Sequence, residues 1–329
     1  MAKTAQPKKK RQKDHDIFLR GVFSLTELVL KFLNYTIPNP LKPFIDFSTL
    51  TMLPDTYVSE KLHITQSDTI YEAQLNKNAL PEEVRNDPKL PNFRFCFLNE
   101  FKSSKPNQPI DFQMDGYVKR IQQYDLKNDN PPSIVIPILL YHGVLQWEQK
   151  RLYDIFSKYL PQVILDYIAY PKYIIIDIQA MSDTQIEEAI GLEELRAAFI
   201  ALKHAHDENY FKHNMKEILK FVENSPTTLL YQTYLEMLVE YSQRRSGLET
   251  EEFSIIIEQE KEDLDMATAF KSIFDYRAEK AVEKAVEKGI IALIRSTKMS
   301  DAQIAEEMEV PVEVVQEIRT KYKSKEAKA

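Results

Sequence analysis

A carboxylate and an amine follow one another at the end of an apolar segment, residues 93–104. Aromatic side chains recur there at alternate positions, namely Phe93, Phe95, Phe97 and Phe101. This alternation predicts a β-strand, because successive strand side chains point to opposite faces. Glu100 and Lys102 are two residues apart, so both emerge on the face opposite the aromatic rings.

A second strand is predicted upstream, at Asp68–Leu75, with Asp68 near its start. If the two strands pair as a hairpin, Asp68 can meet Glu100. Mg²⁺ prefers hard oxygen ligands and keeps several waters, so two convergent carboxylates suffice to hold it against a phosphate. The ammonium of Lys102 can orient an attacking water or offset negative charge on the phosphorus centre. The pattern therefore suits metal-dependent phosphodiester hydrolysis.

The Glu-x-Lys spacing alone is weak, because it occurs three times, at Glu100, at Glu148 and at Glu326. Glu148 follows a glycine turn and is expected to open a helix, and Glu326 lies in a charged tail. Only Glu100 ends an apolar alternating strand that has an Asp-bearing strand before it. Context thus favours the first copy.

The glycine spacing, the net charge and the single cysteine exclude several classes of functional site. The six glycines are widely separated, which excludes a P-loop, a dinucleotide fingerprint and a nucleophile elbow. The net charge of -7 argues against binding nucleic acid through bulk positive charge, although residues 1–13 carry six Lys or Arg and no acid. The single cysteine, Cys96, is expected to be a packing residue.

The longest apolar run, Ile134–Tyr141, is far short of the roughly twenty residues of a membrane helix. The basic start of the chain has no apolar segment behind it, unlike a secretory signal. A soluble, cytoplasmic protein with no membrane partner is therefore expected.

Hydrophobic periodicity predicts an α/β core made of a helix, a mixed sheet, a second helix and a buried strand. The helices are expected at Asp14–Tyr35 and from Pro109 to Tyr124. The continuous apolar run Ser133–Gly143 is typical of a strand buried on both faces, in a parallel position. Further strands are predicted at Val58–Ile64, Asp68–Leu75, Asn92–Lys102 and Tyr170–Ile178.

From Ser182 onward the pattern is helical. Helices are expected at Asp183–Ala205, Tyr210–Val222 and Thr227–Gln243, and a charged helix of four-residue repeats is expected to end at Gly289. The predicted organisation is a disordered tail at 1–13, an α/β domain at 14–180, a helical region at 181–276 and a charged helix with a helical hairpin at 277–329.

The hairpin, Asp301–Met308 and then Pro311–Ile318, is spaced like a helix-turn-helix. Its second helix carries Glu313 and Glu317 ahead of its first base, Arg319. This favours contact between copies of the chain, as a homo-oligomer, over the reading of DNA bases, and both alternatives stay open.

Several segments resemble one known family, the recombination-promoting nuclease or putative transposase (YhgA-like) proteins of bacteria, within the PD-(D/E)XK nuclease superfamily. The resemblance spans Asp14–Asp177. The segments that carry it are His15-Asp-Ile-Phe18, Ser67-Asp-Thr-Ile-Tyr71, Glu100-Phe-Lys-Ser103, Phe112-Gln-Met-Asp-Gly-Tyr117 and Pro137-Ile-Leu-Leu-Tyr-His-Gly143 with Trp147 beyond.

This resemblance implies a restriction-endonuclease-like core and metal-dependent DNA cleavage, with Asp68, Glu100 and Lys102 as the active triad. Where many relatives have Gln, this chain has Lys102, the residue of the wider superfamily. The superfamily often adds an acid from the first helix and a polar residue from the helix after the Glu-x-Lys strand, and Glu27 and Gln113 occupy such places. Asp14 or Asp16 is interpreted as a helix cap.

The resulting hypothesis is a DNA endonuclease that uses Mg²⁺, or Mn²⁺, held by Asp68 and Glu100, and that acts in DNA recombination or transposition. The alternative is a catalytically inactive, DNA-associated or regulatory scaffold that acts through its C-terminal helices.

Overall fold

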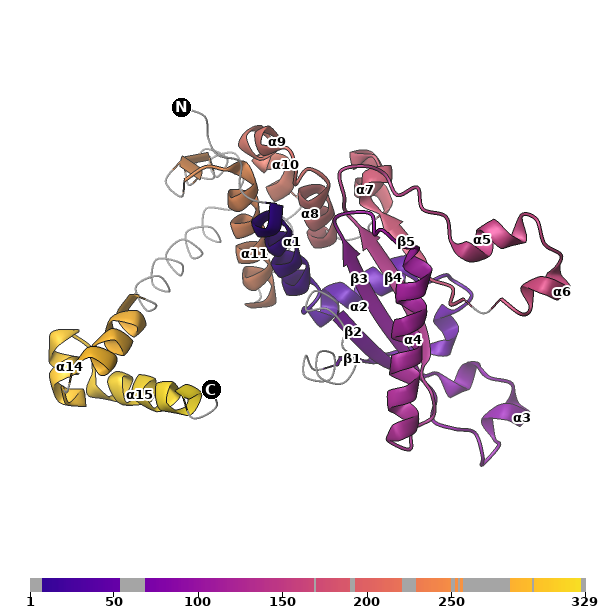
Figure 1. Ribbon diagram of the computed structural model, residues 1–329, viewed down its shortest axis with the longest axis horizontal. Helices are drawn as coiled ribbons and strands as arrows, with labels where there is room; N and C mark the ends of the chain where they lie inside the picture. The colour runs from indigo at the N-terminus through magenta and orange to yellow at the C-terminus, as the bar shows by residue number, and fades with distance from the viewer. Residues whose placement is uncertain are drawn as a thin grey trace. The chain divides into compact units, whose positions relative to one another are not determined.

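The computed structural model describes residues 8–53, 69–168, 170–189, 193–220, 229–249, 252–253, 255–256, 285–297 and 299–326. The chain forms two compact units, residues 1–264 and 265–329. The first unit contains the sheet and most of the helices (Figure 1).

The first unit is built on a five-stranded mixed sheet in the order β1-β2-β3-β4-β5. Its strands are β1 Ile45–Met52, β2 Thr69–Leu75, β3 Arg94–Lys102, β4 Ile134–Tyr141 and β5 Ile174–Asp177. Neighbours up to β3 pair antiparallel, and β3, β4 and β5 run parallel. The expected α/β class and the parallel position of the apolar strand β4 are confirmed. The strand predicted at Val58–Ile64 lies outside the described residues.

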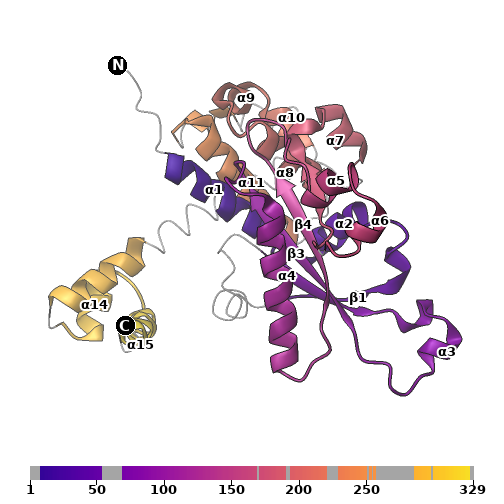
Figure 2. The same ribbon diagram turned by 45° about the vertical axis from the view of Figure 1, so that its right-hand side comes forward.

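One face of the sheet is covered by α4, Ile110–Lys127, which lies across the strands in Figures 1 and 2. Its apolar stripe packs on strand residues of even number from β3, together with residues of β2 and β4. This core is formed by Ile70, Cys96, Leu98, Ile110, Met114, Tyr117, Ile121, Leu139 and Tyr173. Glu100 and Lys102 follow Cys96 and Leu98 at alternate positions of β3, so their side chains lie on the same face of the sheet as α4.

On the opposite face, α2, Thr26–Thr36, packs against β1, whereas α1, Lys8–Val22, packs chiefly on a later helix, α11, Leu229–Ser246. The prediction of one helix at Asp14–Tyr35 was wrong in two respects: the helix begins earlier, and it breaks after Val22. At the break the Ser24 hydroxyl donates to the Gly21 carbonyl, and Phe23 packs edge-on against Phe32 and tilted against Phe101. Tertiary packing of Phe23 therefore outweighs the continuous helical pattern.

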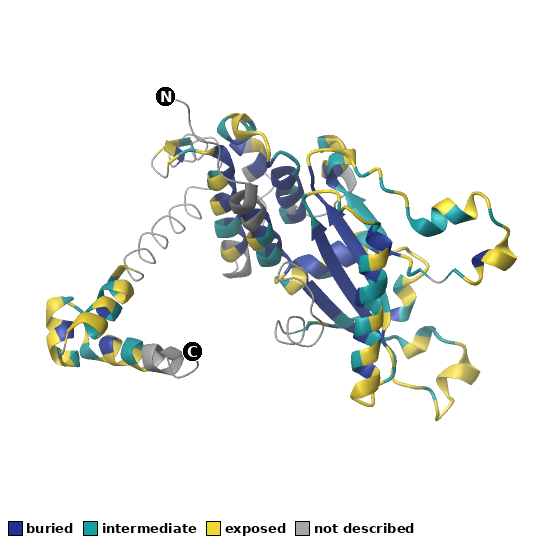
Figure 3. Ribbon diagram, in the orientation of Figure 1, coloured by how far each residue is buried: buried dark blue, intermediate teal, exposed yellow. Residues whose placement is uncertain are grey.

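Several short elements connect the strands. A 3₁₀ turn, η1 Lys42–Phe44, precedes β1, and η3 Lys77–Ala79 and α3 Glu82–Arg85 lie between β2 and β3. Between β4 and β5 the chain forms an extended arm with α5 Leu152–Ser157 and α6 Gln162–Leu165. Figure 3 shows this arm largely exposed, whereas β3 and β4 are buried.

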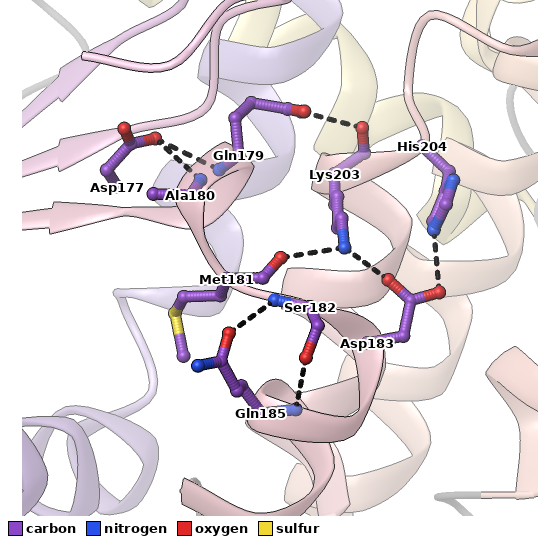
Figure 4. A network of polar contacts seen from close by, with 9 residues as sticks. All are labelled: Asp177, Gln179, Ala180, Met181, Ser182, Asp183, Gln185, Lys203 and His204. Atoms are coloured by element: carbon purple, nitrogen blue, oxygen red, sulfur yellow. Dashed lines mark hydrogen bonds and ion pairs between the residues drawn. The ribbon is translucent and has the colours of Figure 1, made fainter. Parts of the chain in front are cut away.

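Helices follow the sheet, as predicted. They are η4 Ile178–Ala180, α7 Asp183–Ala189, α8 Glu193–Lys203, α9 Glu208–His213, α10 Met215–Lys220 and α11 Leu229–Ser246. A polar network fixes this region to the end of β5 (Figure 4). Lys203 Nζ donates to the Met181 carbonyl at 2.7 Å and pairs with Asp183 at 2.5 Å, and His204 contacts the other oxygen of Asp183 at 3.0 Å.

The second unit has its own small core of Ile290, Ile304, Ala305 and Val315. Residues 285–296 form a helix, so Gly289 does not end it as predicted. The expected hairpin is present as α14 Asp301–Glu307 and α15 Val312–Glu326, with Ser300 and Gln303 forming a capping box. Arg319, the candidate base-reading residue, pairs with Asp301 at 2.5 Å within the hairpin.

No helix in the described parts of the chain combines the length and the apolar character that a membrane crossing requires.

Candidate active site

Glu100 lies near the end of β3 with its side chain completely buried. Lys102 forms an ion pair with its Oε1, which the strand geometry allows because both side chains leave the same face. Gln113 of α4 donates from Nε2 to the same oxygen at 2.8 Å. The structure thus brings together three of the side chains that the sequence selected for this site.

Gln113 reaches Glu100 because it stands on the flank of the α4 stripe that packs on the sheet. Its Nε2 also lies 2.6 Å from the hydroxyl of Tyr117, one helical turn further along. Tyr117 is buried in the core beneath α4, so this contact restricts the rotamer of Gln113. The amide is therefore held in the orientation that serves Glu100.

The second oxygen of Glu100 differs from the first. Oε2 is buried and has no hydrogen-bond partner among the described residues. Burying a charged oxygen without a partner is costly, so such an atom suggests a ligand or ion. A divalent cation with oxygen ligands fits this chemistry. Within the described residues, however, no group of three or more His, Cys, Asp or Glu side chains is arranged to hold a metal ion.

Asp68 lies outside the described residues, and β2 begins at the next residue, Thr69. The pairing of β2 with β3 is the predicted antiparallel one. Thr69 pairs with Asn99, the residue before Glu100, and the Asn99 amide donates to the Thr69 hydroxyl at 3.2 Å. The hairpin on which the Asp68 prediction depends is present, and the role of Asp68 stays a prediction.

Glu27 lies in the first turn of α2, where its side chain is exposed to solvent. A different acid of the first helical segment, Asp16 on α1, lies within electrostatic range of the site. Burial raises the pKa of Asp16, the charge of Lys102 lowers it, and the charge of Glu100 raises it. Because α1 begins at Lys8, Asp16 is well inside the helix and does not cap it.

Sequence reasoning missed Asp16 because it took the helix to begin at Asp14. The available signal was the segment His15-Asp-Ile-Phe18, which carries part of the family resemblance. Two acids of one predicted helix, Glu27 and Asp16, could not be ranked without knowing where that helix breaks.

A buried histidine adjoins the site. His142 follows β4, and its backbone N–H donates to the Lys102 carbonyl at 2.9 Å. Both of its ring nitrogens are buried without a hydrogen-bond partner in the described structure. Its ring lies 5.0 Å from that of His15 on α1. Burial, helped by the nearby charge of His206, lowers the pKa of His142 to about 3, so the ring is neutral at ordinary pH.

Comparison with known proteins gives one match. The family model described as "Putative transposase, YhgA-like" matches residues 13–229, which include Asp16, Glu100, Lys102, Gln113 and His142. No curated protein and no solved structure matches the chain.

Proposed function

The chain belongs to the family described as "Putative transposase, YhgA-like", which indicates a role in DNA transposition or recombination, and we propose that it is a metal-dependent DNA endonuclease. The observation that supports this activity best is the environment of Glu100. One of its oxygens is held by Lys102 and Gln113, and the other is buried without a partner among the described residues.

A purely structural carboxylate is expected to have both oxygens satisfied, since each orphaned buried polar atom destabilises the fold. Glu100, near the end of its strand, keeps one buried oxygen without a partner in the described structure, and its charge acts on a second acid, Asp16. Functional sites tolerate such unfavourable arrangements because a ligand compensates for them on binding. We therefore assign Mg²⁺ or Mn²⁺ as the ligand, with Glu100 and Asp68 holding it and Asp16 as a further acid beside it.

The roles of the remaining side chains follow from their positions. When bound, the cation supplies Lewis-acid polarisation of the phosphate and lowers the pKa of a bound water. Lys102 orients the attacking water, and Gln113 keeps Glu100 in place. The water oxygen bonds to phosphorus and gives up a proton to solvent as the bond from phosphorus to the 3′ oxygen breaks. The 3′ oxygen takes a proton from solvent and leaves as a hydroxyl, so the products are a 5′ phosphate and a 3′ hydroxyl. This assignment agrees with the PD-(D/E)XK pattern that the sequence resembles.

A second candidate is a non-catalytic, DNA-associated or regulatory scaffold. The ion pair between Lys102 and Glu100 favours it, because the ammonium of Lys102 already neutralises the buried carboxylate without a metal ion. On this hypothesis the α/β core is a support and the C-terminal helices bind the partner. Binding of DNA without any metal-dependent cleavage would support the scaffold.

The test compares plasmid cleavage by the wild type, Asp68→Ala and Glu100→Gln in Mg²⁺, in Mn²⁺ and in EDTA. Glu148→Gln is the matched control, because Glu148 belongs to the same Glu-x-Lys spacing but is exposed. We expect nicking by the wild type and by the control only, and only with metal. Equal nicking by all four proteins would rule out the proposed site. If no protein nicks the plasmid, metal binding measured by calorimetry would distinguish a site that binds metal without cleaving this substrate from the absence of a metal site.

A further inference from the structure

We propose that α11, which begins where the family match ends at residue 229, is a positioning element of the active site and fixes the orientation of Asp16. This inference rests on the proposed function, since it concerns the acid that α1 contributes. It extends the functional unit to Ser246, beyond the matched region. Figures 1 and 2 both show α1 and α11 side by side.

The first contact is a buried ion-pair cluster. Asp14 of α1 receives Arg244 on one oxygen at 2.9 Å and Arg245 on the other at 2.5 Å. Asp14 and Arg245 are almost completely buried, with exposed side-chain fractions of 6% and 2%. Buried pairs of this kind contribute little net stability but strongly penalise any arrangement that separates the partners. They therefore select one orientation of α1 against α11.

A second contact lies one residue further along α1. His15 Nδ1 and the Tyr241 hydroxyl are 2.7 Å apart, and the Tyr241 ring stacks on Phe18 at 4.2 Å between centroids. The next turn of α1 carries Gly21, where an added Cβ would come within 2.2 Å of Met237 Sδ. The absence of a side chain at Gly21 thus lets Met237 pack directly on the α1 backbone.

The spacing of these contacts shows how they act on Asp16. Asp14, Phe18 and Gly21 are four and three residues apart, so they form one stripe of α1, and that stripe faces α11. Asp16 lies roughly 200° around the helix from Asp14, at about 100° per residue. The acid is therefore on the side away from α11. The residue before it, His15, lies 5.0 Å from the ring of His142, whose backbone N–H donates to the Lys102 carbonyl, so this part of α1 adjoins the site. A turn of α1 about its axis would carry Asp16 away from that position.

The test uses Tyr241→Phe, which removes only the hydroxyl and keeps the ring that stacks on Phe18. Tyr234→Phe is the control, because it lies on the same helix and also loses a buried hydroxyl, one that donates to the Glu194 carbonyl on α8. Arg244→Ala is a second variant, because Arg244 is half-exposed and its removal leaves Arg245 paired with Asp14.

Two measurements are made on the full chain. Hydrogen exchange without metal reports the protection of α1, and calorimetry reports the affinity for Mn²⁺. For Tyr241→Phe and Arg244→Ala we expect faster exchange in α1 and a roughly 10-fold weaker Mn²⁺ affinity, the effect typical of lost outer-shell support. For Tyr234→Phe we expect unchanged Mn²⁺ affinity, even if the protein unfolds at a lower temperature.

Each other outcome is decisive. Unchanged exchange in α1, or an equal loss of Mn²⁺ affinity in Tyr241→Phe and Tyr234→Phe, would overturn the positioning role. Wild-type affinity in Tyr241→Phe and Arg244→Ala would do the same and leave the proposed function intact. Failure of the wild type itself to bind Mn²⁺ would instead reject the metal site, and with it the inference that depends on it.

Discussion

Two segments of the chain share the Glu-x-Lys spacing, and the structure gives them different environments. Glu100 and Lys102 lie on one face of β3, and they pair with each other beneath α4. Glu148 and Lys150 lie in the irregular segment before α5, where Glu148 is 82% exposed and pairs with Lys105. The strand therefore turns a two-residue spacing into a contact, whereas an irregular segment does not.

The pKa values of two acids, Asp16 near the Glu100 pair and Glu148 on the surface, are shifted in opposite directions. Burial raises the pKa of Asp16, an acid on which the charges of Glu100 and Lys102 act. The hydrogen bond and the charge of Lys105 lower the pKa of Glu148. Burial dominates the shift at Asp16, whereas the pairing with Lys105 dominates the shift at Glu148. Four substitutions test this difference.

The largest effect at neutral pH is expected from Lys102→Met. Loss of the ammonium leaves Glu100 buried with only Gln113 on its first oxygen, so the free energy of unfolding should fall by about 3 kcal/mol, as for other broken buried pairs. Added Mg²⁺ should restore part of the loss. Urea unfolding with and without Mg²⁺ measures both, and Lys150→Met is the matched control. Equal midpoints for the two variants would contradict the contrast.

A smaller effect is expected from Asp16→Asn. Loss of an acid beside the metal should reduce DNA cleavage by about 10- to 100-fold. The raised pKa means that the folded state loses stability relative to the unfolded chain as the pH rises above the ordinary value of 3.8. Asparagine does not ionise, so this loss should be absent from the pH profile of the variant. An unchanged profile together with full cleavage would remove Asp16 from the site.

His142→Leu tests the neutral ring beside the site. His142 faces His15 and His206, and its pKa in the folded state is about 3 instead of 6.5. The unfolded chain therefore binds a proton between these values that the folded state does not. Relative to the variant, the wild type should lose up to about 1.4 kcal/mol of unfolding free energy per pH unit as the pH falls from 6.5 toward 3. Parallel pH profiles of the two proteins would show that the ring is not kept neutral.

The smallest effect is expected from Glu148→Gln. Its lowered pKa means that the pair with Lys105 contributes above the ordinary value of 4.5 and is lost as the pH falls. Exposed pairs are weakened by solvent and salt, so we expect no measurable change in unfolding at neutral pH or in plasmid cleavage. A loss of cleavage here would place the second Glu-x-Lys segment in the function after all.

The sequence predicted the parts that local periodicity determines. Alternation at Phe95, Phe97 and Phe101 located β3, and the apolar stripe located α4, whereas Gln113 was selected from the family resemblance. The continuous run of β4 indicated its parallel position. These features depend on neighbours within a few residues, which is why a strand or helix period reveals them.

The remainder depends on contacts between distant segments. Helical periodicity runs through both α1 and α2, and only the packing of Phe23 against Phe32 and Phe101 decides the break. Nothing local to Asp14 indicates that it pairs with Arg245, 231 residues away. The choice of Asp16 over Glu27 as the acid on which the charges of Glu100 and Lys102 act depends on the same distant contacts.

The pairing of Asp14 with Arg244 and Arg245 also has a consequence for biosynthesis. The buried acid Asp14 is 230 and 231 residues ahead of its two cationic partners, so the cluster cannot form until α11 has been synthesised. At roughly 5–20 residues per second, that interval lasts about ten seconds or more. A nascent or prematurely ended chain that lacks α11 therefore cannot complete the cluster that orients Asp16. On the proposed function, cleavage competence arises only in chains that extend through α11.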